Sequence, residues 1–140
     1  MRESRRISVV RYYSTAWRMS GKSDNSVTLT HKEAPGNAVL TIEWVAKNAS
    51  QAADIRALYE ERLKSLASET RKLEDVRIGG VVAQRYASSI KTGNSVAISL
   101  NVFLSSANTL CFVTFATDRD RFPKYAQQAN DVISTLRALR

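Results

Sequence analysis

Short blocks rich in β-branched and aromatic residues fill the first third of the chain, a pattern typical of strands. Ile7 to Tyr13 is one such block, and Trp17 to Met19 follows it after a Ser-Thr-Ala turn. Val27 to Thr30 and Ala38 to Val45 then flank Pro35-Gly36, which suits the two central positions of a type II turn. The pattern predicts an opening strand, a short second strand and an antiparallel hairpin.

From residue 50 the spacing of apolar positions changes from that of a strand to that of a helix. Apolar side chains now recur at three- and four-residue steps with charged residues between them, so residues 50–66 are predicted to form a helix with one buried stripe. The residues of this stripe are Ile55, Leu58, Tyr59, Leu63 and Leu66.

The second half predicts an antiparallel meander followed by a terminal helix. Three β-segments, Val76 to Ile90, Ser95 to Leu104 and Thr109 to Thr117, are separated by short polar connections. Apolar residues from Arg121 to Leu139 lie on one side of a helix. The last β-segment is apolar on both faces and needs cover on both. We therefore expect an α+β fold in which an antiparallel sheet of about six strands is sandwiched between helices (α-β-α), as a single domain over residues 1–140.

The net charge of +8 is concentrated near the N-terminus. The basic residues of the first 22 positions are Arg2, Arg5, Arg6, Arg11, Arg18 and Lys22. Residues 1–6 are predicted to be a flexible basic terminus, and the whole set is a candidate anion-binding surface. Nucleic-acid readout is disfavoured, because the nearby Tyr12, Tyr13 and Trp17 lie in strand-like settings and are expected in the core.

The sequence offers no set of residues suited to catalysis or metal binding, so we expect a protein that is not an enzyme and has no cofactor. His31 is the one histidine and is expected to be an ordinary surface or strand-end residue. Cys111, the one cysteine, is expected to be a small core residue with a raised pKa. Gly79-Gly80 matches no phosphate-binding loop and predicts a bend or bulge where another backbone approaches.

Asp118 and Asp120 precede the terminal helix and are candidate N-caps. On this interpretation, replacing Asp120 with Ala costs about 1 kcal/mol through a lost cap.

Several local patterns resemble those of the PsbP-like superfamily. They are Tyr12 to Trp17 near the start, Arg77 to Ala83 after the first helix, and Phe115 to Tyr125 with Val132 to Leu136 at the end. Ser14 and Thr15 stand where that family usually has a proline before the early tryptophan. The resemblance implies an α-β-α sandwich and a non-enzymatic role, as in extrinsic photosystem II subunits, bacterial envelope lipoproteins and a nuclear-transport factor that binds the small GTPase Ran.

The resulting hypothesis is a non-catalytic binding or assembly module with a protein partner, peripheral to an envelope or membrane-associated complex. The resemblance implies a location outside the cytoplasm. One alternative is a small-molecule carrier with a pocket between the first helix and the sheet, walled by Trp44, Tyr59 and Tyr86. The other is an anionic-surface binder that uses the basic N-terminal stretch.

Overall fold

The computed structural model describes residues 7–8, 16–46, 57, 60–61, 69–105, 109–134 and 137–138. The strands are β1 (Ile7–Ser8), β2 (Trp17–Ser23), β3 (Ser26–His31), β4 (Val39–Ala46), β5 (Glu69–Lys72), β6 (Val76–Ile78), β7 (Val81–Thr92), β8 (Ser95–Ser105), β9 (Thr109–Asp118) and β10 (Arg137–Ala138). Helix α2 spans Phe122–Ile133.

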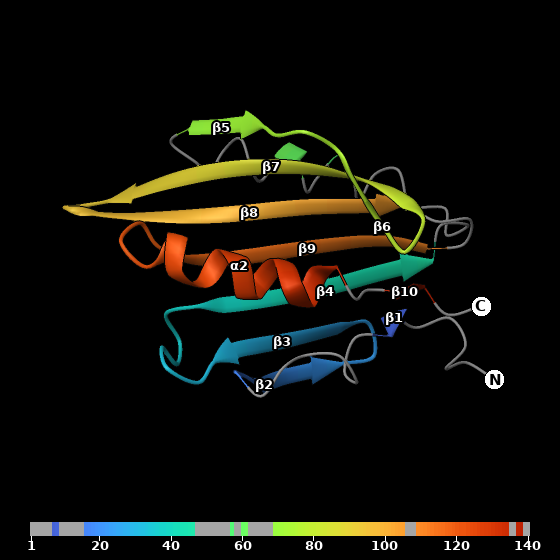
Figure 1. The fold of residues 1–140 in the computed structure, drawn as a ribbon, viewed down its shortest axis with the longest axis horizontal. Coiled ribbons are helices and arrows are strands. Elements are labelled where there is room, and N and C mark those ends of the chain that lie inside the picture. The colour runs from blue at the N-terminus through green and yellow to red at the C-terminus, as the bar shows by residue number, and fades with distance from the viewer. Residues whose placement is uncertain are drawn as a thin grey trace.

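One antiparallel sheet dominates this fold (Figure 1). Its eight strands follow the order β2-β3-β4-β9-β8-β7-β5, and β6 pairs with β7 beside this path. β1 and β10 form a separate two-stranded antiparallel sheet. The predicted α+β class and the antiparallel pairing are confirmed, whereas the main sheet has more than the expected six or so strands.

The main sheet gains β5, which the sequence does not predict, and β6, which is divided at Gly79-Gly80 from the expected single strand Val76 to Ile90. Ile78 pairs directly with Val81, so the two glycines form a two-residue hairpin turn between β6 and β7. Their φ angles of 58° and 82° are both positive, as a type I′ turn requires. A Cβ atom at Gly80 would meet nothing within 4 Å, so this glycine is needed for its backbone conformation and not for the close backbone approach expected from the sequence.

The hairpin of β3 and β4 forms as its turn residues predict. The backbone N–H of Asn37 donates to the carbonyl of Ala34 at 2.9 Å, which closes a turn around Pro35 and Gly36. Gly36 has a φ of 77°, the value that the second central position of a type II turn needs.

The terminal helix ends earlier than the apolar pattern predicts. α2 stops at Ile133, and the Ser134 hydroxyl donates to the carbonyl of Asp131 at 2.9 Å. Arg137–Ala138 then pairs with Ile7–Ser8 instead of continuing the helix to Leu139. Of the predicted opening strand, only Ile7–Ser8 lies within the described residues.

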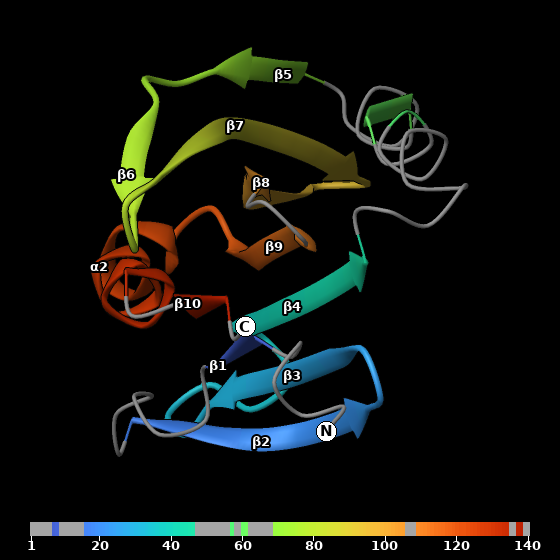
Figure 2. The ribbon, with the colours of Figure 1, turned by 90° about the vertical axis from the view of Figure 1, so that its right-hand side faces the viewer.

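α2 covers one face of the main sheet, which we call the helix face (Figure 2). Four buried helix residues, Tyr125, Ala129, Val132 and Ile133, belong to one core with Leu40, Ile42, Leu100, Val102, Val113 and Phe115 of the sheet. Trp17 and Trp44 are only 1% and 9% exposed and belong to the same core, which for Trp17 confirms the expected core position.

The opposite face, which we call the far face, also carries buried side chains. Phe103 and Phe112 are each 5% exposed and their rings meet edge to face, with centroids 5.0 Å apart. The helix predicted over residues 50–66 lies outside the described residues except for positions 57, 60 and 61, which are helical. The sandwich between two helices therefore stays a prediction.

Candidate binding groove

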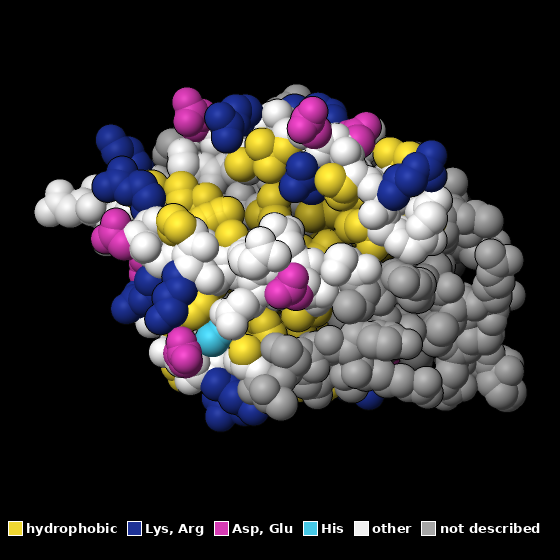
Figure 3. Space-filling model, viewed as in Figure 1, with side chains coloured by type: hydrophobic (Ala, Val, Ile, Leu, Met, Phe, Trp, Pro, Cys, Tyr) yellow, Lys and Arg dark blue, Asp and Glu magenta, His cyan; other side chains and the backbone are white. Residues whose placement is uncertain are grey.

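A groove of about 210 Å³ opens between β6 and the last turns of α2. Its walls come from β6, β7, β8 and the end of the helix, through Val76, Arg77, Ile78, Arg85, Val102, Asn130, Ile133 and Ser134. In Figure 3, hydrophobic side chains gather over the region between α2 and strands β5 to β7, with basic side chains among and around them. We call the recess with this lining the β6–α2 groove.

The β6–α2 groove exists because the chain folds β6 back along β7. The two-glycine turn reverses the chain, and the segment before β6 is held against β7 by two hydrogen bonds with Arg85. The backbone N–H of Leu73 donates to the Arg85 carbonyl at 2.9 Å, and Arg85 Nε donates to the Glu74 carbonyl at 2.9 Å. These bonds hold the segment before β6 against β7 and fix the position of Arg85 Nε.

The charged groups of the groove have carbonyl partners and no acidic ones. Arg77 Nη1 donates to the Gly80 carbonyl at 3.1 Å, and Arg85 Nε uses the Glu74 carbonyl. Neither guanidinium forms a salt bridge with any residue that the structure describes. The side-chain amide of Asn130, on the helical wall, likewise makes no hydrogen bond within the described ranges. The groove therefore combines an aliphatic lining with the Arg85 guanidinium and the Asn130 amide, which are available to a ligand, whereas Arg77 pairs with the exposed Val82 on the outer side of β6.

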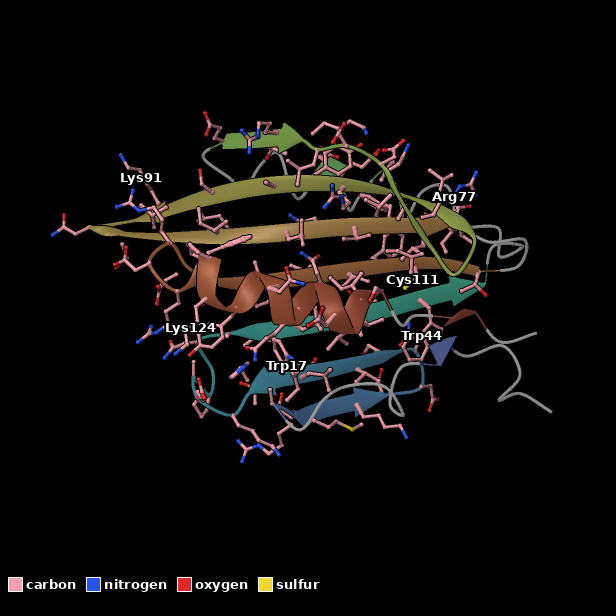
Figure 4. All side chains as sticks on the ribbon, in the orientation of Figure 1. Trp17, Trp44, Arg77, Lys91, Cys111 and Lys124 are labelled. Atoms are coloured by element: carbon pink, nitrogen blue, oxygen red, sulfur yellow. The ribbon has the colours of Figure 1, made fainter. Side chains whose placement is uncertain are left out.

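The residues predicted to wall a carrier pocket are not brought together. Trp44 pairs with Cys111, which pairs in turn with Leu104, and this register places Trp44 on the helix face. Figure 4 shows Trp44 and Cys111 close together at the ends of their strands. Tyr86 lies on the far face, where its ring meets Phe103 edge to face at 6.1 Å. Tyr59 lies outside the described residues.

The predicted anion-binding set is also divided. Arg2, Arg5, Arg6 and Arg11 lie outside the described residues. Arg18 and Lys22 are exposed on β2, opposite Thr30 and Val27 of β3. Their spacing of four residues would place them on one face of a regular strand, but an irregularity between Met19 and Gly21 turns them to opposite faces.

His31 is buried and not on the surface, at 1% exposure. Its Nδ1 accepts a hydrogen bond from the Glu33 N–H at 3.1 Å, so the neutral ring carries its proton on Nε2, which donates to Gln128 Oε1 at 2.7 Å. The ring also lies 5.1 Å from Trp17 and 4.4 Å from Tyr125, centroid to centroid. His31 thus joins the end of β3 to α2, and among the described residues it has no carboxylate partner of the kind that acid-base catalysis uses.

A second, polar hollow of about 400 Å³ lies where the β7–β8 turn meets the segment before α2. Asp118 Oδ1 accepts the Arg121 backbone N–H at 2.9 Å, and Asp118 Oδ2 pairs with the Arg121 guanidinium. Asp120, the other predicted cap, makes no side-chain hydrogen bond within the described ranges, and Arg121 itself occupies the N-cap position. Asp118 is therefore the residue that anchors this helix start, and the predicted cost of removing Asp120 loses its structural basis.

The Asp118 interaction predicts a specific dependence of stability on pH. The backbone N–H of Arg121, more than its guanidinium, holds the pKa of Asp118 below its ordinary value. A depressed folded-state pKa stabilises the fold fully above the unfolded value of about 3.9, and this contribution is lost as pH falls through the folded-state pKa. We expect D118N to be less stable than wild type at pH 7, with the difference shrinking below about pH 4. Urea titrations across this range measure it, and an unchanged difference would contradict it.

Cys111 lies in the core at 3% exposure, as the sequence predicts. Burial, with a smaller contribution from the charge of Glu43, raises the pKa of this thiol to about 12. The reactive thiolate is therefore absent at pH 8 in the folded protein. We expect iodoacetamide to leave Cys111 unmodified until urea unfolds the chain, as mass spectrometry can measure. Rapid modification of the folded protein would show that Cys111 is accessible.

Metal-binding clusters and membrane-spanning helices are both absent from the described residues. No group of three or more His, Cys, Asp or Glu residues suited to a metal ion occurs in the described part of the chain. No helix among the described residues has the length and apolar character needed to cross a membrane.

Comparison with known proteins relates the chain to others by fold alone. No known protein family matches the sequence, and neither does any curated protein. LpqN of Mycobacterium tuberculosis, involved in cell envelope biogenesis, is similar with a TM-score of 0.66 and 14% identity over 96% of this chain and 83% of LpqN. PA94 of Pseudomonas aeruginosa, a protein of unknown function, is similar with a TM-score of 0.62 and 14% identity over 86% of this chain and 88% of PA94. A protein from Bacteroides thetaiotaomicron is similar with a TM-score of 0.64 and 19% identity over 91% of this chain and 44% of that protein.

Proposed function

We propose that this chain is a non-catalytic binding module, an accessory protein of an envelope or membrane-associated complex, and that the β6–α2 groove is its protein-binding surface. The observation that carries the proposal is an aliphatic groove beside the Arg85 guanidinium, which has no acidic partner among the described residues. The fold shared with LpqN, a protein involved in cell envelope biogenesis, supports the setting. On the same basis we assign the chain to the PsbP-like group, with a helix on each face of the sheet.

The size of the groove favours a protein partner over a small molecule. Pockets that enclose drug-sized ligands have volumes of about 300–1,000 Å³ and bury most of the ligand. The β6–α2 groove, at about 210 Å³, is smaller and suits the side chains of a partner segment. The carrier alternative also loses its walls, because Trp44 and Tyr86 lie on opposite faces of the sheet.

The proposal is tested by blocking the groove without disturbing the rest of α2. Asn130 lines the groove, whereas Gln127 lies on the same helix and is exposed. Tagged wild type, N130W and Q127W, each checked for folding by circular dichroism, are used to recover proteins from a membrane-enriched lysate of the source cells.

We expect wild type and Q127W to recover the same partner and N130W to lose it. A partner that N130W recovers equally would place binding elsewhere on the molecule. Recovery of no protein by the wild type would count against an assembly role altogether.

A further inference from the structure

The chemistry of the β6–α2 groove also indicates what kind of segment it binds. We infer that it recognises a protein segment in which an apolar side chain lies beside a carboxylate, with Arg85 pairing with the carboxylate. This inference rests on the proposed function, because it assumes that the groove is the binding surface. It adds the recognition chemistry to that function.

Arg85 is the group best placed to select a carboxylate. The bond from its Nε to the Glu74 carbonyl uses one of five N–H donors and fixes the stem of the guanidinium group. The other donors remain for a ligand, and a guanidinium can hold a carboxylate through two parallel hydrogen bonds. Because Arg85 is already held in place, pairing costs it less conformational entropy than a free surface arginine would lose.

The acidic residues near Arg85 do not neutralise it. Glu74 contributes its backbone carbonyl, and the Asp75 carboxylate is paired with Lys72 at 2.8 Å. Arg77, labelled in Figure 4 beside the β6–β7 turn, pairs with Val82 on the outer side of β6 and adds to the positive charge of the surrounding surface. The overall charge of +8 further favours the approach of an acidic partner.

The apolar walls define the second half of the recognition. Val76 and Ile78 of β6, Val102 of β8 and Ile133 of α2 surround the recess into which an apolar side chain would pack. Asn130, whose amide makes no hydrogen bond within the described residues, can donate to or accept from the backbone of a bound segment. Burying the anchor displaces water from around the ion pair and strengthens it.

A recessed groove with one guanidinium group differs from a membrane-binding surface. Binding to anionic membranes uses clusters of several basic residues spread over a face, or a broad amphipathic surface. Here one guanidinium group lies beside a small aliphatic recess. A polypeptide segment can present an acidic side chain to the guanidinium and a neighbouring apolar side chain to the recess. The occupant that fits this groove is therefore a protein segment.

The test uses a synthetic array of decapeptides in which Leu, Phe or Val is placed at different spacings from Asp or Glu. A matched array carries Asn or Gln in place of each acid. Binding to the full chain is measured by fluorescence polarisation for wild type, R85M, R85K and R18M. R85M keeps the apolar stem of Arg85 and removes its charge, whereas Arg18 is exposed on the edge strand β2, away from the groove.

We expect wild type and R18M to prefer the acidic peptides, R85M to bind them about tenfold more weakly and lose the preference, and R85K to fall between. Equal binding of both arrays, or a preference that R85M keeps, would overturn the inference. So would binding of phosphatidylglycerol vesicles with no peptide binding. If N130W loses a native partner while the arrays show no acid preference, the proposed function stands and only the recognition chemistry fails.

Discussion

Replacing Phe115 with Ala is expected to lower the free energy of unfolding by about 3–5 kcal/mol, the range seen for large aromatic truncations in cores. Phe115 is 0% exposed on β9, which lies between β4 and β8 in the sheet. Its ring centroid lies 6.2 Å from that of Trp17 and 5.7 Å from that of Phe122, at the start of α2. The truncation therefore opens a cavity where the β2–β3 end of the sheet, the central strand and the helix meet.

Urea unfolding of F115A, followed by circular dichroism, measures this loss. The matched control is V82A, which truncates an apolar side chain that is 47% exposed and should change stability by no more than about 0.5 kcal/mol. If F115A itself does not fold, F115L supplies a milder truncation at the same site and should still lose more than V82A. A loss in F115A no larger than that in V82A would show that α2 does not pack on this part of the sheet.

Replacing His31 with Ala is expected to lower the free energy of unfolding by about 2–4 kcal/mol. The change removes a buried ring from between Trp17 and Tyr125. It also leaves the Glu33 N–H and the Gln128 amide without their imidazole partner. Because Glu33 is exposed and Gln128 half-buried, the two lost bonds add about 1 kcal/mol each at most, and the cavity left by the buried ring contributes the rest.

The same unfolding measurement on K32A provides the control, because Lys32 is the exposed neighbour of His31. Combining H31A with Q128A in a double-mutant cycle isolates the bond between the two side chains, which should couple them by about 1 kcal/mol. Equal stability of H31A and K32A would mean that His31 is the surface residue that the sequence indicates.

Local turn chemistry accounts for most of what the sequence predicted correctly. Pro35-Gly36 specifies a type II turn through the local backbone preferences of those two residues, and the β3–β4 hairpin forms around it. Gly79-Gly80 carried an equally local signal for a two-residue hairpin, but the apolar run on both sides of it favoured one continuous strand.

The burial of His31 could not be predicted, because it depends on a residue 97 positions away. Lys32 and Glu33 give its neighbourhood a polar character, and only the docking of α2 places Gln128 against the ring. The end of the last helix has a similar cause. Its apolar periodicity continues past Ile133, but pairing of Arg137–Ala138 with Ile7–Ser8 replaces the helix there.

The β6–α2 groove was missed because no short stretch of sequence contains it. Its lining comes from three strands and a helix. Arg85 lies within β7, and a single charged residue in a strand does not indicate a binding site. The sequence indicates Trp44 and Tyr86 as pocket residues by their aromatic character, which carries no information about strand register. The register then separates them by placing one on each face.

The claim that the β6–α2 groove is a protein-binding surface is tested most directly by photo-crosslinking in the source cells. A benzoylphenylalanine residue replaces Asn130, which lines the groove, or Gln127, which is exposed on the same helix. We predict that irradiation links position 130 to one protein and leaves position 127 unlinked. Equal crosslinking from both positions, or none to protein from position 130, would contradict the claim.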